Sequence, residues 1–376
     1  MRIRIERRLG QPRWLPVAVP FGSVVFAFVA VAVVLGATGH NPAQSYAKLF
    51  RSAFTDNGAL SATLVSATPL AFTGLAAAAA FRMNLFNIGG EGQLYFGVVG
   101  AVAAGLVLGG GSPGPLSIAV MCVAGAAAGA AWAAIPGILR AFGRTNEIIT
   151  SLMLNYVAAV IIDHLIFNSH SYWRDTTSPS AAVFPQGQAI PDTAVWPFAT
   201  IHGLAGGIAV PLGFGFACLV AAGLWVLYNR TRFGFEVQVI ADSPRAARYA
   251  GMRTRRKILA VMCISGAIAG LGGASQAGNF DHLLDPRSLE GQLYGYTGIV
   301  VAALARYNPF VVVPIAFLLG GLKNAGFALQ GVDFPSGLVG VIEGILLFSV
   351  LGGELFSRYR IRVERRAQDS ASKATG

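Results

Sequence analysis

Charged residues are scarce in this sequence. Only 12% of its 376 residues are Asp, Glu, Lys or Arg, whereas 54% are apolar and 47 are glycine. In an ordinary soluble domain about a quarter of the residues are charged, so this composition argues against that class of protein. Cysteine is rare as well, since Cys122, Cys218 and Cys263 all lie in apolar runs without metal-ligand spacing. We interpret them as small packing residues and expect no metal site.

Motifs for catalysis and nucleotide binding are missing too. The sequence has no Gly-Lys pair and therefore no Walker-type phosphate loop. No zinc-ligand spacing and no nucleophile elbow is present, and the histidines are scattered: His40, His164, His170, His202 and His282. We expect the chain not to be an enzyme, to hold no cofactor and not to hydrolyse ATP itself.

Long apolar runs are abundant. A hydrocarbon core about 30 Å thick is crossed by roughly 20 apolar helical residues. We count about ten candidate spans, at residues 17–39, 60–81, 94–109, 116–139, 148–167, 204–228, 258–276, 294–305, 310–329 and 336–351. The third and eighth are short for a straight span and are expected to be half-helices or re-entrant segments. The first is too long for a signal-peptide core and is expected to be retained.

The predicted fold is an all-α polytopic membrane protein with about ten transmembrane helices. A single transmembrane domain is expected over residues 1–376. Within it, a basic amino-terminal segment at 1–16 precedes a membrane domain at 17–355, and a basic tail follows at 356–376.

Basic residues predict the orientation, because Lys and Arg accumulate in short cytoplasmic loops. With the amino terminus inside, most of the 28 Lys and Arg residues fall on the cytoplasmic side. The opposite side holds only Lys48, Arg51, Arg174 and Arg287, and Lys323 lies inside the ninth run. Both termini are therefore predicted to be cytoplasmic. The net charge of +11 is then explained by topology and by attraction to anionic lipid, and nucleic-acid binding is not expected.

A short string is duplicated. Residues 91–95 and 290–294 both read Glu-Gly-Gln-Leu-Tyr, and each copy follows a helix rich in small residues. Because the copies lie five spans apart, the two halves would have opposite orientations in the membrane. Inverted halves with broken helices are a recurrent transporter design, so we expect two inverted five-helix halves. Close glycine pairs, such as Gly125 with Gly129 and Gly266 with Gly270, are attributed to ordinary helix packing.

Polar residues at membrane depth are costly unless they face a cavity or a partner. We therefore take the following as candidates for the substrate pathway: Asn87, Glu91, Gln93, Asn146, Glu147, Asn155, Glu290 and Gln292. Asn146 or Glu147 could instead cap the fifth span. A further carboxyl, Glu343, lies in the last run, where it is either protonated and hydrogen-bonded or exposed to a polar route.

The segment at 229–257 is the most distinctive polar region. Ser243 or Asp242 can cap a short helix that begins at Pro244, and Gly251 can end it. One interpretation is an amphipathic helix held to lipid headgroups by its basic residues.

Several of these segments together resemble the inner-membrane permeases of bacterial ATP-binding-cassette importers for nucleosides and simple sugars, within the branched-chain amino-acid permease superfamily. The resemblance covers about residues 60–351 and is carried by segments 84–93, 146–149, 152–156, 298–302 and 308–309. The asparagine-rich first segment is more similar to the nucleoside branch than to the ribose branch, which usually has Asp-Leu-Ser there.

The resemblance implies a permease of the bacterial inner membrane that works with an ATP-binding subunit, a second permease and an extracytoplasmic solute-binding protein. It implies that the segment near 234–252 is a coupling helix docked on the ATPase, through Ser243, Pro244, Arg245, Ala247, Arg248 and Gly251. An alternative is an ion-coupled secondary transporter that carries protons on Glu91, Glu147 or Glu343. A membrane scaffold or intramembrane enzyme is a third possibility, for which we find no catalytic constellation.

Overall fold

A computed structural model describes residues 2–7, 15–201, 207–329, 337, 340–342, 344–345, 348–349, 352–353 and 359–364. The chain divides into two compact units. The larger unit is Ala43–Ser336, and the smaller combines Met1–Pro42 with Gly337–Gly376. Glu343 lies outside the described residues, as does half of the tenth predicted span.

The smaller unit joins the two ends of the chain. Strand β1 (Arg2–Arg7) pairs antiparallel with β4 (Tyr359–Glu364), so that Arg2 lies opposite Glu364. Helix α1 (Leu15–Ala37) belongs to the same unit, and its Ser23 hydroxyl donates to the Ser349 carbonyl at 2.8 Å.

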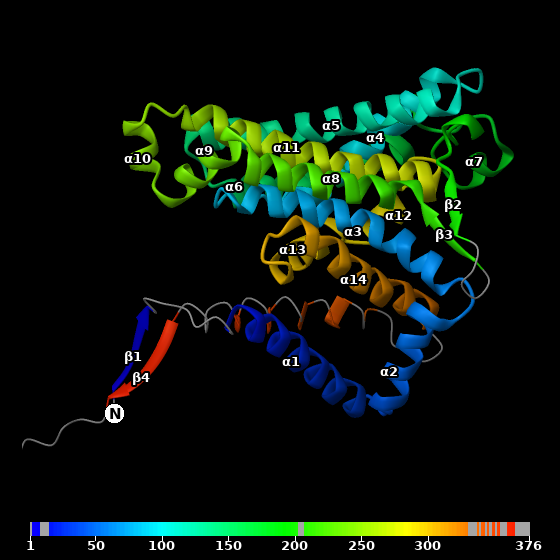
Figure 1. The fold of residues 1–376 in the computed structure, drawn as a ribbon. Helices are drawn as coiled ribbons and strands as arrows, with labels where there is room; N and C mark the ends of the chain where they lie inside the picture. Colours follow the sequence, from blue (N-terminus) through cyan, green and yellow to red (C-terminus); the bar gives the residue numbers. More distant parts are fainter. Residues whose placement is uncertain are drawn as a thin grey trace, which may run out of the picture. The chain divides into compact units, whose positions relative to one another are not determined.

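The larger unit is a helical bundle with one short hairpin (Figure 1). Its first half comprises α2 (Pro42–Phe50), η1 (Arg51–Thr55), α3 (Ala59–Phe81), α4 (Gly90–Leu108), α5 (Gly114–Gly143), α6 (Glu147–Asp163), η2 (His164–Asn168), α7 (Pro179–Val183) and η3 (Asp192–Ala194). Then follow β2 (Phe198–Ile201), β3 (Ile208–Pro211), α8 (Leu212–Arg230), α9 (Arg232–Asp242), α10 (Pro244–Tyr249), α11 (Thr254–Gln276), η4 (Ala277–Asp281), α12 (Pro286–Glu290), α13 (Tyr294–Leu304) and α14 (Pro309–Leu329).

Seven helices among the described residues are long and apolar enough to cross a membrane, and an eighth is added if Phe21–Ala37 and Pro42–Thr55 form one span. The protein is therefore a multi-pass membrane protein, and its described residues are all-α apart from the β1–β4 pair and the β2–β3 hairpin. Helix α13 has only 11 residues, as its short apolar run suggested. Helix α4, in contrast, has 19 residues and begins earlier than its apolar run, because the polar side chains of its first turn are buried and hydrogen-bonded within the bundle.

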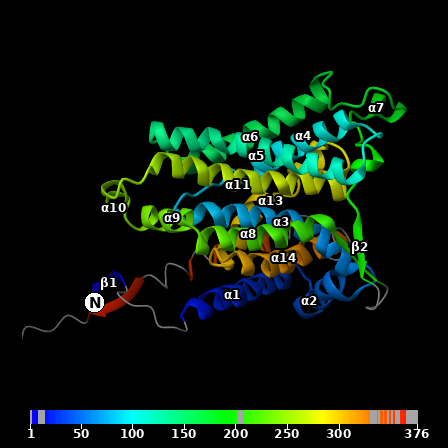
Figure 2. The ribbon, with the colours of Figure 1, turned by 45° about the horizontal axis from the view of Figure 1, so that its top comes forward.

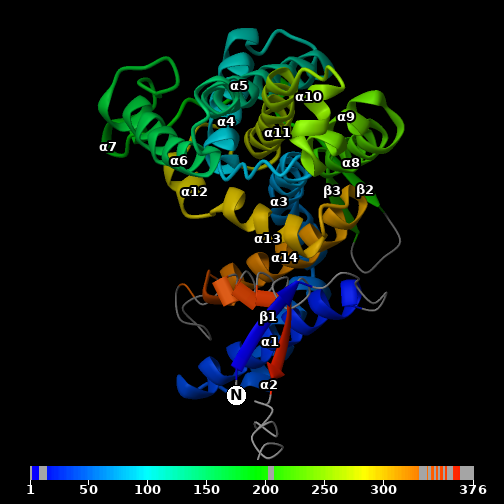
Figure 3. The ribbon, with the colours of Figure 1, turned by 90° about the vertical axis from the view of Figure 1, so that its left-hand side faces the viewer.

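Helix α3 lies at the centre of the bundle, with α11, α13, α14 and α8 around it (Figure 3). Small residues allow the closest approaches between helices. Helices α5 and α11 run side by side (Figure 2), and a Cβ on Gly129 would collide with the backbone of Gly266 and Gly270. The glycines singled out in the sequence therefore do serve helix packing.

Contacts between the two sequence halves are reciprocal. Helix α3, which precedes the first Glu-Gly-Gln-Leu-Tyr copy, packs on α13, which begins at the last residue of the second. Helix α11, which precedes the second copy, packs on α4, which contains the first. Each half therefore completes the packing of the other.

Candidate functional site

The chain leaves helix geometry between α3 and α4. After Phe81 it turns at Asn84, whose φ is 54°, and its amide donates to the Ala241 carbonyl at 3.1 Å. Residues 85–89 then lead into α4, which begins at Gly90. The backbone groups of this break require partners other than a helix, and the polar side chains predicted from the sequence provide several of them.

Asn87 is the centre of a buried amide network. Its side-chain amide donates to Gln93 Oε1 and to Ser265 Oγ, both at 2.9 Å, and its oxygen accepts from Gln93 Nε2 at 2.9 Å. Ser265 in turn donates to the Ala76 carbonyl at 2.7 Å. The network joins the break to α4, α11 and α3. Such fully satisfied networks fix the relative position of the elements they link.

Asn155, on α6, holds the same break from the other side. Its oxygen accepts from the Gly92 N–H, and its amide donates to the Ile88 carbonyl, both at 2.9 Å. The amide also lies 3.2 Å from the Tyr296 hydroxyl on α13. One asparagine therefore connects α6, the break before α4 and α13.

Glu91 crosses from one sequence half to the other. Its carboxylate is buried, and Oε2 accepts a hydrogen bond from the Gly295 N–H in the first turn of α13. A carboxylate is favourable there because the first N–H groups of a helix are unpaired and carry partial positive charge. The other oxygen, Oε1, is buried without a hydrogen-bond partner among the described residues.

The second copy of the repeat has the same sequence and a different conformation. Glu290 is exposed at the end of α12, Leu293 has a φ of 51°, and α13 begins only at Tyr294. Glu91 and Gln93, in contrast, lie inside the first turn of α4 and are buried. Gln292 contributes its backbone carbonyl, which accepts a hydrogen bond from Lys323.

Lys323 was not identified as a site residue from the sequence. It lies on α14, is 7% exposed, and places its ammonium group 5.5 Å from the centre of the Tyr294 ring. Its hydrogen bond to the Gln292 carbonyl stabilises the non-helical residues before α13. Glu91 accepts from an N–H group in the first turn of α13 itself. The signal was present, since Lys323 is the one lysine within a predicted span.

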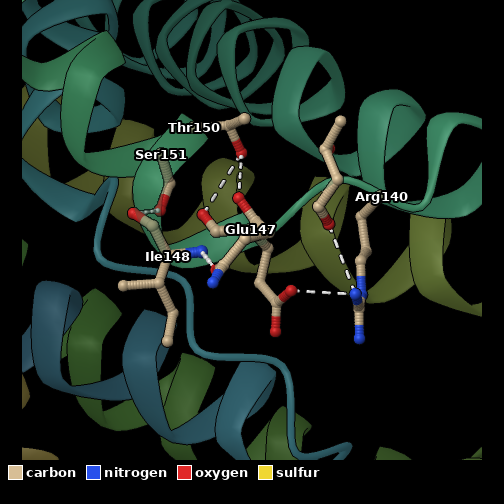
Figure 4. A network of polar contacts seen from close by, with 7 residues as sticks. Arg140, Glu147, Ile148, Thr150 and Ser151 are labelled. Atoms are coloured by element: carbon tan, nitrogen blue, oxygen red, sulfur yellow. Dashed lines mark hydrogen bonds and ion pairs between the residues drawn. The ribbon is translucent and has the colours of Figure 1, made fainter.

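Asn146 and Glu147 lie apart from this network, at the start of α6 (Figure 4). Asn146 is the N-cap and accepts from the Ile148 N–H at 2.9 Å. Glu147 forms an ion pair with Arg140 Nε of α5 at 3.1 Å. The Asn146 contact fits the capping interpretation, whereas Glu147 pairs with a side chain of the preceding helix. A link to the break runs through Ser151, whose hydroxyl accepts from the Ile88 N–H.

The segment between α8 and α11 forms two short helices at one end of the bundle (Figure 1). Ser243 caps α10 by accepting from the Ala246 N–H at 3.3 Å, and Pro244 is its first residue. Ala247 is fully buried, whereas Tyr249 is 94% exposed. Arg248 Nε donates to the Pro244 carbonyl, and Gly251 has a φ of +73°, which ends the helix. Arg245 is exposed on the first turn.

Comparison with known proteins identifies the family. Residues 59–351 match the model of the branched-chain amino acid transport system permease component. The glucose ABC transporter permease TsgB13 of Haloferax volcanii is 33% identical over 100% of this chain and 98% of its own length. The guanosine ABC transporter permease NupP of Bacillus subtilis is 33% identical over 92% of this chain and 94% of its own. The nucleoside ABC transporter permease NupB of Lactococcus lactis is 29% identical over 89% and 90%.

These matches extend over nearly the whole chain, including the polar break before α4, the linked helices α6 and α13 and the segment that contains α10. A permease component has no ATP-hydrolysing motif of its own, in agreement with the missing phosphate loop. The chain belongs to the family of branched-chain amino acid transport system permease components and is the membrane-spanning permease of an ATP-binding-cassette transporter rather than an enzyme.

Proposed function

We propose that this permease imports nucleosides, with simple sugars as the second candidate class, and that a separate ATPase subunit drives the transport. The observation that carries the choice is the similarity to a guanosine permease and a nucleoside permease over 92% and 89% of this chain. The glucose permease of comparable identity keeps sugars in consideration.

Uptake by the reconstituted full assembly tests this proposal. Proteoliposomes that contain this chain, its ATPase, its partner permease and the solute-binding protein would be offered labelled guanosine or glucose, with and without ATP. We expect ATP-dependent guanosine uptake that unlabelled nucleosides suppress and glucose does not. ATP-dependent uptake of glucose alone would assign the sugar class. Uptake driven by a proton gradient without ATP would contradict the importer mechanism.

Both chain ends are proposed to be cytoplasmic. The pairing of β1 with β4 supports a common side for the two termini, because strands separated by a membrane cannot pair. The distribution of Lys and Arg supports the cytoplasmic choice. The loop at 169–199 is then external and the segment at 229–257 internal.

The membrane domain is proposed to comprise about ten spans in two inverted halves, including the run at 336–351. The reciprocal packing of α3 with α13 and of α4 with α11 supports this arrangement, because an internal two-fold relation would exchange those pairs. The conformations of the two copies differ, so the proposed two-fold relation is approximate at the breaks.

The polar network is proposed to border the translocation route and to stabilise the broken helices beside it. Asn87 and Asn155 satisfy backbone groups of one break, and Gln93 holds the Asn87 side chain. Glu91 and Lys323 bond to backbone groups of the other break. Glu290, Gln292, Asn146 and Glu147 stay candidates at the ends of this region.

Helix α10 is proposed to be the coupling element that docks on the ATPase. The fully exposed ring of Tyr249 and the arginines on the surface of α10 are available for that contact, while buried Ala247 fixes the helix to the bundle. A second permease and an extracytoplasmic solute-binding protein are proposed to complete the importer.

A further inference from the structure

A basic cleft lies beside α10, between α9 and the first two turns of α11. It has a volume of about 520 Å³. Four cationic side chains line it, namely Arg232, Arg253, Arg256 and Lys257, against one carboxylate, Glu236. Such an excess of one charge in a concave surface attracts counterions strongly.

The one carboxylate in the lining of the cleft, Glu236, already forms an ion pair with Lys257. Glu236 Oε2 lies 2.8 Å from Lys257 Nζ, and this hydrogen bond keeps the pKa of Glu236 below its ordinary value. The Lys257 ammonium also lies over the Phe233 ring, 4.5 Å from its centre. Among the residues that the structure describes, Arg253 and Arg256 form no ion pair, so these two arginines carry charge that no described carboxylate offsets.

The position of these arginines on α11 adds to the imbalance. Arg253 is the N-cap, and Arg255, Arg256 and Lys257 lie in the first turn, which contains no acidic residue. The amino-terminal end of a helix carries partial positive charge, so acidic groups or anions are stabilising there and cations are not. An anion bound in the cleft would offset both the helix end and the arginines.

The cleft also overlaps the start of the candidate span formed by α11. Its lining extends from Arg253 to Ala260, while the candidate span begins at Thr254 and becomes apolar at Ile258. The exposed ring of Phe235 forms another part of the wall. The site therefore offers cations at headgroup depth and apolar surface next to them, which matches an amphiphile with a phosphate group better than a small soluble anion.

We propose that this cleft binds the phosphate of an anionic phospholipid from the adjacent leaflet, with Arg253 and Arg256 as its principal contacts. Lipid bound there would brace α9 against α11 at the base of α10. Lipid binding at this cleft does not depend on which solute the assembly carries.

Native mass spectrometry of the purified full chain tests this site, with phosphatidylglycerol and phosphatidylcholine of identical acyl chains as probes. Each surface arginine contributes about 1 kcal/mol to anionic-lipid binding, which is about fivefold in affinity. We expect Arg256→Gln to weaken phosphatidylglycerol binding about fivefold and R253Q/R256Q about 25-fold, with phosphatidylcholine unaffected. Arg256→Lys should retain most of the preference because it keeps the charge.

Arg255→Gln is the matched control, since Arg255 lies on the same turn but outside the cleft, 5.6 Å from the Phe142 ring. Equal losses in R255Q and R256Q would show a general surface-charge effect and overturn the site. A loss in R256K as large as in R256Q would also contradict it, as would no preference for phosphatidylglycerol in the parent chain. Competition by millimolar inorganic phosphate, with no gain from the acyl chains, would assign a soluble anion instead of lipid.

Discussion

Glu91 and Gly295 are 204 residues apart in the sequence and are joined by a buried hydrogen bond, in which the Gly295 N–H donates to the Glu91 carboxylate. The bond connects the first turn of α4 to the first turn of α13, and so connects the first copy of the repeated string to the residue directly after the second. A Cβ at Gly295 would collide with the Glu91 backbone, so this close approach also depends on glycine.

Removing the Glu91 carboxylate should remove the hydrogen bond that links the first turn of α4 to the first turn of α13. A hydrogen bond to a charged group contributes about 1.5–3 kcal/mol, and its loss leaves the Gly295 N–H buried without an acceptor. We expect Glu91→Ala to reduce solute uptake per assembled transporter more than it reduces membrane insertion, and Glu91→Gln, which keeps an acceptor oxygen, to lie between. Glu290→Gln changes the corresponding carboxylate of the other copy, where the side chain is exposed, and should have the smaller effect. Parental uptake by E91A would reduce Glu91 to a packing role.

Lys323 should stabilise the fold by donating a hydrogen bond to the Gln292 carbonyl, in the non-helical segment before α13. Lys323→Met keeps most of the side-chain volume and leaves the Gln292 carbonyl without this donor, at a cost of about 1–3 kcal/mol. We expect a lower thermal unfolding midpoint and reduced uptake. Lys323→Arg retains the charge and should recover part of both. If K323M unfolds at the parental midpoint, the ammonium group does not stabilise the break.

Breaking α10 should abolish coupling without preventing insertion. The Ala247 N–H donates to the Ser243 carbonyl at 3.1 Å, and proline at 247 would remove this donor at a cost of about 3 kcal/mol. We expect Ala247→Pro to insert in the membrane, to lose transport and to lose the stimulation of ATP hydrolysis by the loaded binding protein. Ala247→Gly keeps the donor and should cost only about 1 kcal/mol. Import by A247P at the parental rate would show that α10 is not the coupling element.

Arg248, one of the two exposed arginines of α10, tests whether charge contributes to docking on the ATPase. Arg248→Glu reverses the charge while leaving the cap at Ser243 in place. We expect weaker, salt-sensitive association with the ATPase, measured by co-purification at low and high ionic strength. Equal recovery of the ATPase with R248E and the parent at low salt would assign docking to shape alone.

Helix packing predicts a contrast between two glycines. A Cβ on Gly270 would collide with the Gly125 carbonyl, whereas a Cβ on Gly215 of α8 would have no atom within 4 Å. Overpacking typically costs about 1–3 kcal/mol, so Gly270→Ala should lower the unfolding midpoint and Gly215→Ala should not. Equal midpoints for the two variants would mean that α5 and α11 separate at no cost.

Topology can be read from exposed side chains on the two predicted faces. Thr176 is exposed in the loop at 169–199, and Tyr249 is exposed on α10. In a chain whose Cys122, Cys218 and Cys263 are replaced by alanine, T176C should react with an impermeant thiol reagent from outside and Y249C only after the cytoplasmic face is opened. Labelling of Y249C in intact cells would reject the proposed orientation.

Much of the architecture was predictable, because crossing a membrane imposes length and hydropathy on each helix. The apolar runs led to α3, α5, α6, α8, α11 and α14, and the cap at Ser243 with Pro244 led to α10. The resemblance carried by residues 84–93 and 146–156 was confirmed by the family match. Counting spans was harder at α13, because hydropathy does not distinguish a short buried helix from half of a broken span.

The sequence by itself determined the class of protein, the breaks near the repeated string and the small residues of the helix contacts. The sequence could not determine which buried polar groups would form hydrogen bonds with one another. Only the tertiary structure brought Asn87 to Ser265, Glu91 to Gly295 and Lys323 to the Gln292 carbonyl. It also gave identical strings different conformations, one helical and one broken. The physical reason is that a buried polar group is satisfied by whichever donor or acceptor packing brings within about 3 Å, and that neighbour is set by helix rotation and crossing, not by local sequence.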